Sequence, residues 1–238
     1  MTLYFSSHLR GISYPRVICT FKDVNLRMRD SVETLFIDSG IFEGEFRDEA
    51  KLIDVQNEFA DVASPPDYWN DIEGTVRAAV YWTGRISLEN EQRCYPLQGD
   101  NPEDYIRCLE RLREEGISPV YVGLGGLIRR PRKEINAILN YCIPILHEQN
   151  IRVHIFGLGA TWAHVLKALQ PYSWDSSTAI RYAIDNILFD DTLKHHQFKI
   201  PWRGEFQKAL LAQWNNNKID WYMNNDMLTQ TTFEEFFE

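Results

Sequence analysis

Short apolar segments alternate with helical patterns along most of the chain, and this alternation restricts the possible fold more than any other feature. The apolar segments are rich in β-branched and aromatic residues, as buried strands are, and Gly, Asp or Ser closes them. They span residues 16–21, 34–37, 93–97, 120–124 and 152–156. Because strands that alternate with helices run parallel and are joined by crossover helices, the sequence predicts an α/β fold.

The helical patterns lie between these segments. Residues 102–115 are the clearest case, because Asn101 is suited to cap a helix, Pro102 to its first position and Gly116 to its end. Residues 132–148 and 161–169 follow the same logic. The second half of the chain is therefore expected to run strand, helix, strand, helix.

Polar residues and glycines follow six of the expected strands. They are Asp38-Ser39-Gly40, Asp61, Gln98-Gly99, Gly125-Gly126-Leu127, Gly157-Leu158-Gly159 and Trp174-Asp175-Ser176. A doubly wound sheet and a closed (β/α)8 barrel both gather their functional groups at the carboxyl ends of parallel strands. Six such ends, spread over the chain, favour a barrel of the TIM type.

The length of 238 residues and the hydrophobic content of 44% are typical of one globular domain. We expect a catalytic barrel over residues 1–190 and a helical closure or extension of the same domain over residues 191–238. Since no apolar run reaches the ~18–20 residues of a membrane-spanning helix, and the first residues lack a signal-peptide pattern, we expect a soluble, cytoplasmic protein without a membrane partner.

Charge and cysteine content exclude further classes. The net charge of −9 argues against a protein that coats nucleic acid nonspecifically, because such binding depends on Lys and Arg. The four cysteines, Cys19, Cys94, Cys108 and Cys142, are too far apart in sequence to form a close zinc-binding or redox pair. We therefore expect no metal and no cofactor.

Six segments carry a resemblance through their order along the chain. They are FIDSGIF (36–42), ADVASPPDY (60–68), PLQGDNPEDY (96–105), VGLGGL (122–127), HIFGLGATWAHVLKAL (154–169) and SWDSSTAIR (173–181). In this order they resemble the tRNA-guanine transglycosylases, over about residues 34–181. Each segment is short, but six in the same order are hard to obtain by chance.

The resemblance implies a (β/α)8 barrel that exchanges guanine in a nucleic acid for a 7-deazaguanine base, through a covalent enzyme–sugar intermediate. It implies that Asp175 is the nucleophile and that Asp38 handles the proton on the base. The residues that it assigns to base recognition are Asp61, Gln98, Gly125, Gly126 and Ser39. Ile41 and Glu43 differ from the usual glycine and glutamine of the first motif, which affects the shape of that loop.

The same residues suit this chemistry on physical grounds. Breaking an N-glycosidic bond needs one carboxylate to attack the sugar and a second group to protonate the leaving base. Asp175 should stay ionised, while Asp38 would work better with a raised pKa. A carboxylate such as Asp61 can accept the two donors of guanine, N1–H and the amino group. The base must leave its stack to enter such a pocket, where Tyr68, Trp69 or Trp162 could stack on it.

Basic residues follow the Gly-Gly strand end. Arg129, Arg130, Arg132 and Lys133 form the densest cluster, and we expect them, with Arg181, to contact the nucleic-acid backbone. A looser cluster, in which Trp202 lies, comprises Lys194, His195, His196, Lys199 and Arg203. His154 is expected to be a hydrogen-bonded core residue rather than a functional one.

The substrate is expected to be DNA. No cysteine follows Cys142, whereas the tRNA enzymes carry a cysteine-rich zinc site after the barrel, and this chain is also shorter than they are. Both features look more like the DNA-guanine transglycosylases, which insert 7-deazaguanine bases such as free preQ0. The alternatives are the same reaction on tRNA, a catalytically silent nucleic-acid-binding subunit, and an unrelated barrel hydrolase with a metal.

Overall fold

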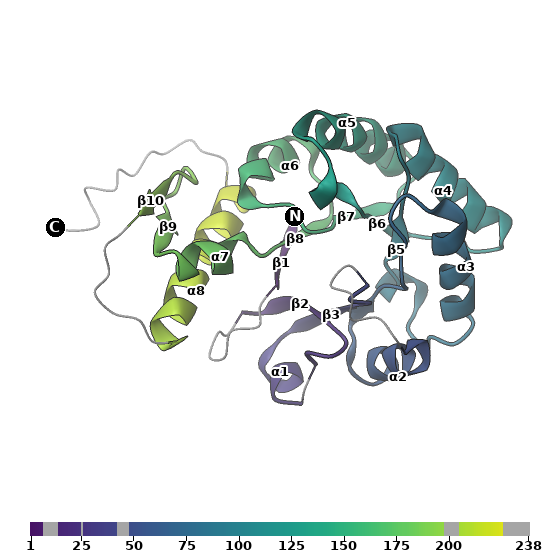
Figure 1. Ribbon diagram of the computed structural model, residues 1–238, viewed down its shortest axis with the longest axis horizontal. Helices are drawn as coiled ribbons and strands as arrows, with labels where there is room; N and C mark the ends of the chain where they lie inside the picture. Colours follow the sequence, from purple (N-terminus) through teal and green to yellow (C-terminus); the bar gives the residue numbers. More distant parts are fainter. Residues whose placement is uncertain (7–13, 25, 42–47, 198–204, 226–238) are drawn as a thin grey trace.

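The protein is an α/β domain, seen in a computed structural model that describes residues 1–6, 14–24, 26–41, 48–197 and 205–225 (Figure 1). Its main sheet has eight strands in the order β4-β3-β2-β1-β8-β7-β6-β5, and all neighbours in it are parallel. The strands are β1 (Thr2–Ser6), β2 (Arg16–Thr20), β3 (Thr34–Asp38), β4 (Val62–Ala63), β5 (Tyr95–Leu97), β6 (Tyr121–Leu124), β7 (Arg152–Ile155) and β8 (Ser173–Ser176).

The two end strands of this order, β4 and β5, approach each other. Ala63 of β4 forms an isolated parallel bridge with Arg93, and the N–H of Cys94 donates to the carbonyl of Ala63 at 2.9 Å. The first and last strands of the sheet are therefore linked by backbone contact, just before β5 begins.

Helices lie around the outside of the strands in Figure 1. They are α1 (Leu26–Ser31), α2 (Glu49–Phe59), α3 (Ile72–Thr83), α4 (Pro102–Glu114), α5 (Arg132–Glu148), α6 (Ala163–Leu169) and α7 (Thr178–Ile184), with short 3-10 helices η1 (Asn90–Gln92), η2 (Leu127–Arg129) and η3 (Ala160–Trp162). The side chains of Asp48, Asp71 and Asn101 cap α2, α3 and α4 by accepting backbone N–H groups.

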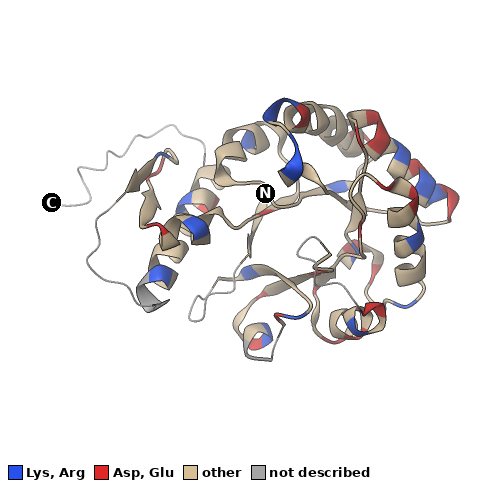
Figure 2. Cartoon of the chain, in the orientation of Figure 1, with Lys and Arg blue, Asp and Glu red and all other residues tan. Residues whose placement is uncertain are grey.

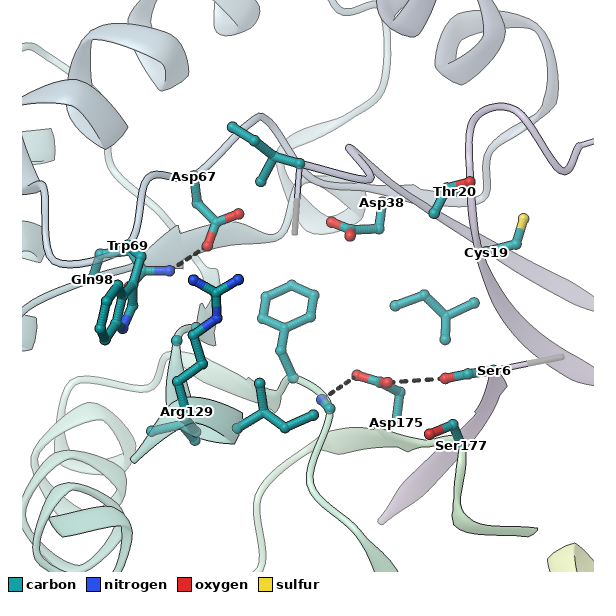
Figure 3. Close-up of a pocket in the computed structure, with 18 of the residues that line it drawn as sticks. Ser6, Cys19, Thr20, Asp38, Asp67, Trp69, Gln98, Arg129, Asp175 and Ser177 are labelled. Atoms are coloured by element: carbon teal, nitrogen blue, oxygen red, sulfur yellow. Dashed lines mark hydrogen bonds between the residues drawn. The ribbon is translucent and has the colours of Figure 1, made fainter. Parts of the chain in front are cut away.

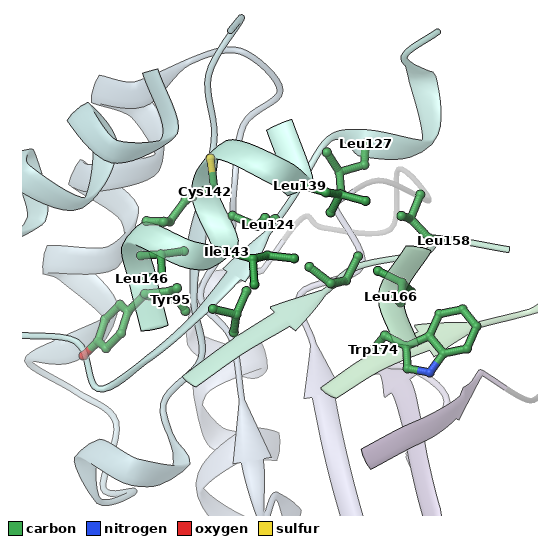
Figure 4. Close-up of a cluster of buried hydrophobic side chains, with 14 of the residues drawn as sticks. Tyr95, Leu124, Leu127, Leu139, Cys142, Ile143, Leu146, Leu158, Leu166 and Trp174 are labelled. Carbon is green, nitrogen blue, oxygen red and sulfur yellow. The ribbon is translucent and has the colours of Figure 1, made fainter. Parts of the chain in front are cut away.

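Apolar side chains gather in separate buried clusters. The largest cluster packs the helices on the strands, with Leu139, Ile143 and Leu146 of α5 buried near Leu124 of β6 (Figure 4). A smaller cluster comes mainly from the strands themselves and includes Tyr4, Ile18, Phe36, Cys94 and Tyr121. A third cluster includes Val17 and Cys19 of β2 with Leu35 and Ile37 of β3. The strands thus contribute apolar side chains to three clusters among the described residues, as expected for a sheet buried on both faces.

A small second sheet and a long helix follow the main sheet along the chain. Strands β9 (Ile187–Phe189) and β10 (His195–Gln197) are antiparallel, and α8 (Glu205–Asn224) follows. The buried Asn215 of α8 ties this part to the rest, because it donates to the carbonyl groups of Ala179 and Ile187 and accepts the N–H of Phe189. The region predicted as a helical extension therefore also contains a strand, and its residues 198–204 and 226–238 lie outside the described part.

Most of the predicted elements agree with the structure. The five apolar segments contain β2, β3, β5, β6 and β7, and the predicted helix at 132–148 is α5, Arg132–Glu148. The segment predicted as one helix at 161–169 is divided between η3 and α6. In the described part of the chain, no helix is both long and apolar enough to cross a membrane.

One buried side chain, Gln56 of α2, joins three elements near the end of β3. Its amide donates to the carbonyl groups of Ile37 and Ser64, at 3.0 and 2.8 Å, and accepts the indole N–H of Trp82 at 2.6 Å. Ile37 precedes the predicted catalytic Asp38 on β3, and the hydroxyl of Ser64 donates to the carboxylate of Asp38. The amide of Gln56 therefore supports the site as well as the fold.

We predict that Gln56→Leu lowers the free energy of unfolding by about 3 kcal/mol, because it leaves buried carbonyl and indole groups unpaired while keeping a similar side-chain volume. Urea denaturation measures the loss. The exposed neighbour Glu58 gives a control, since Glu58→Gln should change the same quantity by less than about 0.5 kcal/mol. Equal stability of the two variants would contradict the role of Gln56.

Candidate active site

A pocket of about 540 Å³ lies at the carboxyl ends of the parallel strands. Its walls come from eight places along the chain: the ends of β1, β2, β3, β5 and β8, the loop after β4, and the segments after β6 and β7. A cavity of this size suits a small organic ligand. The carboxyl ends of the strands are where α/β folds gather functional side chains.

Asp175, at the end of β8, is held by three hydrogen bonds. Its Oδ1 accepts the backbone N–H of Gly157 at 2.9 Å and lies 3.1 Å from Nε2 of His154, while Oδ2 accepts the hydroxyl of Ser6 at 3.0 Å. Asp175 is only 8% exposed, so these donors replace the water that a carboxylate would otherwise bind. They fix the orientation of the carboxylate.

Asp38, at the end of β3, lies in a different environment. Its Oδ1 accepts the hydroxyl of Ser64 at 2.8 Å, and its Oδ2 accepts the N–H of Gly40 at 3.4 Å. Burial raises the pKa of Asp38 because it disfavours the charged carboxylate, and the negative charge of Asp175 adds to this rise against the hydrogen bonds from Ser64 and the backbone. Asp38 is thus suited to carry a proton.

The two carboxylates line the same pocket, and Figure 3 shows them on opposite sides of it. Asp175 lies near Ser6 and Ser177 on one side, and Asp38 lies near Thr20 and Cys19 on the other. A ligand between them would meet one well-supported carboxylate and one with a raised pKa. This difference is what an acid and a nucleophile require.

Asp67 and Gln98 form another part of the pocket wall, apart from the sides of Asp175 and Asp38. The amide Nε2 of Gln98 donates to Oδ2 of Asp67 in a short hydrogen bond, and Figure 3 shows the guanidinium of Arg129 pointing toward the same pair. Gln98 is 2% exposed, and among the described residues its Oε1 has no hydrogen-bond partner. This wall therefore offers a carboxylate and a buried carbonyl oxygen to hydrogen-bond donors of a ligand.

Gly125 and Gly126 allow this wall to pack closely. A Cβ on Gly125 would lie 2.5 Å from Nε2 of Gln98, and a Cβ on Gly126 would lie 2.7 Å from its Oε1. Gly126 also has a φ of +69°, which disfavours other residues. The N–H of Gly125 donates to the carbonyl of Leu97, so Gly126 is the member of the pair to consider as a donor to a ligand.

Two arginines, Arg129 and Arg181, line the pocket, whereas Arg132, at the start of α5, is not among the described residues that line it. The guanidinium of Arg129 lies 5.4 Å from the ring centre of Trp69, which is 51% exposed, and that of Arg132 lies 5.0 Å from Trp162. Figure 2 shows the basic stretch where η2 leads into α5. Such pairs of arginine and aromatic ring suit both the phosphates and the bases of a nucleic acid.

Two of the predicted backbone contacts have other positions. The side chain of Arg130 is 5% exposed and donates to the carbonyl groups of Gly99 and Asp100 and to Oδ1 of Asn70, so its prediction as a phosphate contact is wrong. It ties η2 to neighbouring loops instead. Lys133 is exposed on the first turn of α5 and is not among the described residues that line the pocket.

Asp61 is also not where the sequence suggested. It precedes β4 rather than following it, and it accepts Nη2 of Arg29 at 2.9 Å and the N–H of Leu35 at 2.8 Å. Because the amino end of a parallel strand lies away from the carboxyl ends, the structure does not bring Asp61 into the pocket with most of the other predicted base-binding residues. Asp67, on the loop after β4, occupies the pocket.

Ser39 is buried behind the pocket wall, where its hydroxyl accepts the N–H of Ile41 at 3.4 Å. It shapes the turn after β3 but is not among the described residues that line the pocket. Glu43, Lys199, Trp202 and Arg203 lie outside the described residues. The other predicted pocket residues, Asp38, Asp175, Gln98, Gly125, Gly126, Arg129 and Arg181, are brought together in the pocket.

Three side chains that line the pocket or contact Asp175 were not expected there from the sequence: Ser6, Asp67 and His154. Ser6 ends β1, whose TLYFS sequence has the composition of the other strands and could have been recognised. Asp67 follows a Pro-Pro turn, which is a weak signal. His154 was expected to be a satisfied core residue, and it is buried, but its ring also contacts Asp175.

Comparison with known proteins adds no relative. No protein-family model matches the chain, and no curated protein sequence matches it significantly. Within the described ranges, no cluster of three or more His, Cys, Asp or Glu side chains is arranged to hold a metal ion.

The raised pKa of Asp38 predicts a pH-dependent stability. Between the ordinary value of 3.8 and the higher folded value, the folded protein binds more protons than the unfolded chain, so raising the pH through this range destabilises the fold. We predict that Asp38→Asn increases the free energy of unfolding at pH 7, and that the increase shrinks as the pH falls toward 3.8. Urea denaturation across this range measures both; an increase that does not vary with pH would contradict the assignment.

Proposed function

We propose that the protein exchanges guanine in DNA for a 7-deazaguanine base, through a covalent intermediate on Asp175. The observation that carries this proposal is the pair of carboxylates in one pocket, one held by three donors and the other with a raised pKa. A double displacement at an N-glycosidic bond needs this combination. The motif order that resembles the transglycosylases supports it independently.

The proposal includes a closed (β/α)8 barrel. Its support is the parallel order of the eight strands, the bridge between Ala63 and Arg93, and the apolar cluster contributed mainly by the strands. A closed barrel has no free sheet edge and brings the carboxyl ends of all its strands to one face. The proposed reaction requires such convergence, because its residues come from β1, β3, β5 and β8 and from loops between them.

In the first displacement, an oxygen of Asp175 attacks C1′ of the deoxyribose as the bond between C1′ and the base nitrogen breaks. The electron pair of that bond goes to the base, and Asp38 supplies the proton that neutralises it. Oδ2 of Asp175 is the better placed nucleophile, because it accepts one hydrogen bond whereas Oδ1 accepts two. Asp38 is left as a carboxylate.

In the second displacement, a free 7-deazaguanine takes the place of guanine. Asp38 removes the proton from its ring nitrogen, that nitrogen attacks C1′, and the ester bond to Asp175 breaks. The donors from Gly157 and His154 to Oδ1 stabilise the carboxylate as it leaves. Each residue returns to its starting state, and the reaction needs no cofactor.

Asp67 replaces Asp61 as the proposed reader of the base. Its carboxylate can accept N1–H and the amino group of guanine, and Oε1 of Gln98 can accept a further donor hydrogen. The N–H of Gly126 is available in the proposal for the carbonyl oxygen of the base. Adenine lacks this combination of donors, so its binding would leave buried acceptors unpaired.

The DNA strand is proposed to cross the mouth of the pocket. Arg129 and Arg181 line the pocket and supply positive charge there, while the exposed Trp69 offers a surface on which a base can stack. Arg132, at the start of α5, adds a further cation beyond the pocket lining. The target guanine must leave its stack to reach the carboxylates.

We predict that the protein forms a covalent adduct with guanine-containing DNA and that Asp175→Asn abolishes it. A denaturing gel detects the adduct as a shifted band, which free preQ0 should discharge. Exchange of labelled guanine should fall by at least about a thousandfold, because the nucleophile is removed. Asp185→Asn, at the end of α7, removes an exposed carboxylate and should change neither result.

Assays with DNA, tRNA and preQ0 distinguish the proposed function from its alternatives. An adduct and exchange with tRNA alone would assign the protein to the tRNA reaction. Binding of DNA without exchange under any substrate condition would indicate the silent subunit, and retained exchange in Asp175→Asn would remove the proposed nucleophile. A metal-dependent hydrolase would release the base without incorporating preQ0.

We also predict that Arg129→Gln weakens DNA binding at every sequence and lowers the salt dependence of the binding constant by about one ion per site, since one phosphate contact is lost. Fluorescence anisotropy over a series of salt concentrations measures both. Arg113→Gln is the matched control, because Arg113 is exposed on α4 and bonded to Gln149. The same salt dependence in both variants would place the DNA elsewhere.

A further inference from the structure

Four side chains form a continuous hydrogen-bonded chain that leads from the pocket into the buried interior. Nε2 of His154 lies 3.1 Å from Oδ1 of Asp175, Nδ1 of His154 lies 2.9 Å from Oγ of Ser173, and this hydroxyl lies 2.6 Å from that of Tyr121. His154, Ser173 and Tyr121 are at most 1% exposed. We call these four residues the Tyr121–Asp175 chain.

Strand pairing explains why the chain is continuous. Ser173 and Asp175 are two residues apart on β8, so they point to the same side of the sheet. His154 on β7 is the direct register partner of Ser173, which puts its ring between them. Tyr121 starts β6, next to β7, and reaches Ser173 across that strand.

The two end residues of the Tyr121–Asp175 chain determine the direction of each hydrogen bond in it. An ionised Asp175 can only accept, so Nε2 of His154 must carry a hydrogen. Burial raises the pKa of Tyr121 well above its usual value, so the tyrosine keeps its hydrogen and donates it. Ser173 then accepts from Tyr121 and donates to Nδ1 of His154, and every hydrogen in the chain has an acceptor.

The other tautomer breaks this order. A hydrogen on Nδ1 would have to point at Ser173, whose own hydrogen would turn toward Tyr121, and the hydroxyl hydrogen of Tyr121 would then lose its acceptor. In the described part of the structure, Ser173 is the hydrogen-bond partner of that hydroxyl. Nε2 would also face Asp175 with a lone pair.

We propose that Ser173 and Tyr121 are positioning residues for Asp175: they fix His154 as the tautomer with hydrogen on Nε2, which anchors Oδ1 and leaves Oδ2 for attack. This inference rests on the proposed function for its catalytic consequence, since Asp175 is the nucleophile there. Its structural content, the tautomer of His154, is independent of any reaction. A tyrosine on β6 thereby controls a carboxylate at the end of β8.

The tautomer can be read in the resting protein by nitrogen-15 NMR of the imidazole rings, with His154→Gln used to assign the signal among the six histidines. We expect hydrogen on Nε2 and a bare Nδ1 in the native protein. Tyr121→Phe keeps the ring and removes only the hydroxyl, so Ser173 can turn away from Nδ1 and we expect a larger fraction of the tautomer with hydrogen on Nδ1 than in the native protein. Tyr172→Phe is the control, because its ring stacks edge-on against Tyr121 outside the chain.

Kinetics of base exchange test the consequence. Tyr121→Phe should lower kcat about tenfold, the effect of losing one hydrogen bond that orients the nucleophile, while KM for DNA stays unchanged. Tyr172→Phe should leave both constants unchanged. A merely structural role of the tyrosine would change stability without separating kcat from KM.

The outcomes are distinct from those that test the proposed function. Hydrogen on Nδ1 in the native protein overturns the inference, as does a kcat of Tyr121→Phe equal to that of Tyr172→Phe. If no exchange is found with any substrate, the proposed function fails, and the NMR spectra alone decide whether the chain fixes the tautomer.

Discussion

A buried carboxylate must be surrounded by donors, and this requirement at Asp175 links the fold to the site. The donors come from Ser6 at the end of β1 and from His154 and Gly157 on and after β7. Strands β1 and β7 are the two neighbours of β8 in the sheet, so the donors are in place only when all three strands pair in the observed register. A slip by one residue would turn each side chain to the opposite face of the sheet. Strand pairing therefore sets the chemistry of the pocket directly.

Sequence pattern was sufficient for much of the fold but not for the ends of its shortest strand. Five apolar segments predicted strands, and the capping residues of α4 predicted its start. Strand β4 has only two residues, so a polar residue beside it does not reveal which end it marks. Asp61 was interpreted as following the strand although it precedes it, and Asp67, beyond the Pro-Pro turn, takes the place in the pocket.

The role of His154 depends on information that a local pattern does not contain. Its ring meets Ser173 and Asp175, which are 19 and 21 residues away along the chain, because β7 and β8 are neighbours. An alternating strand places a histidine on one face, but the partner on that face comes from another strand. Gly123 shows the same limitation, since a Cβ there would lie 2.1 Å from the ring of Phe156 on the adjacent segment.

The distribution of charge in the pocket constrains the orientation of a ligand. Asp38, Asp67 and Asp175 all line it, whereas the arginines Arg129 and Arg181 line it with exposed side chains. The mutual repulsion of carboxylates contributes to the raised pKa of Asp38, so an anion among them would be disfavoured. A neutral base that presents N–H donors would pair with Oε1 of Gln98, which has no hydrogen-bond partner among the described residues, while a phosphate would be favoured beside the arginines. In the proposed reaction, the base of a nucleotide enters the pocket and its phosphates remain outside, which meets both conditions and puts C1′ between Asp38 and Asp175.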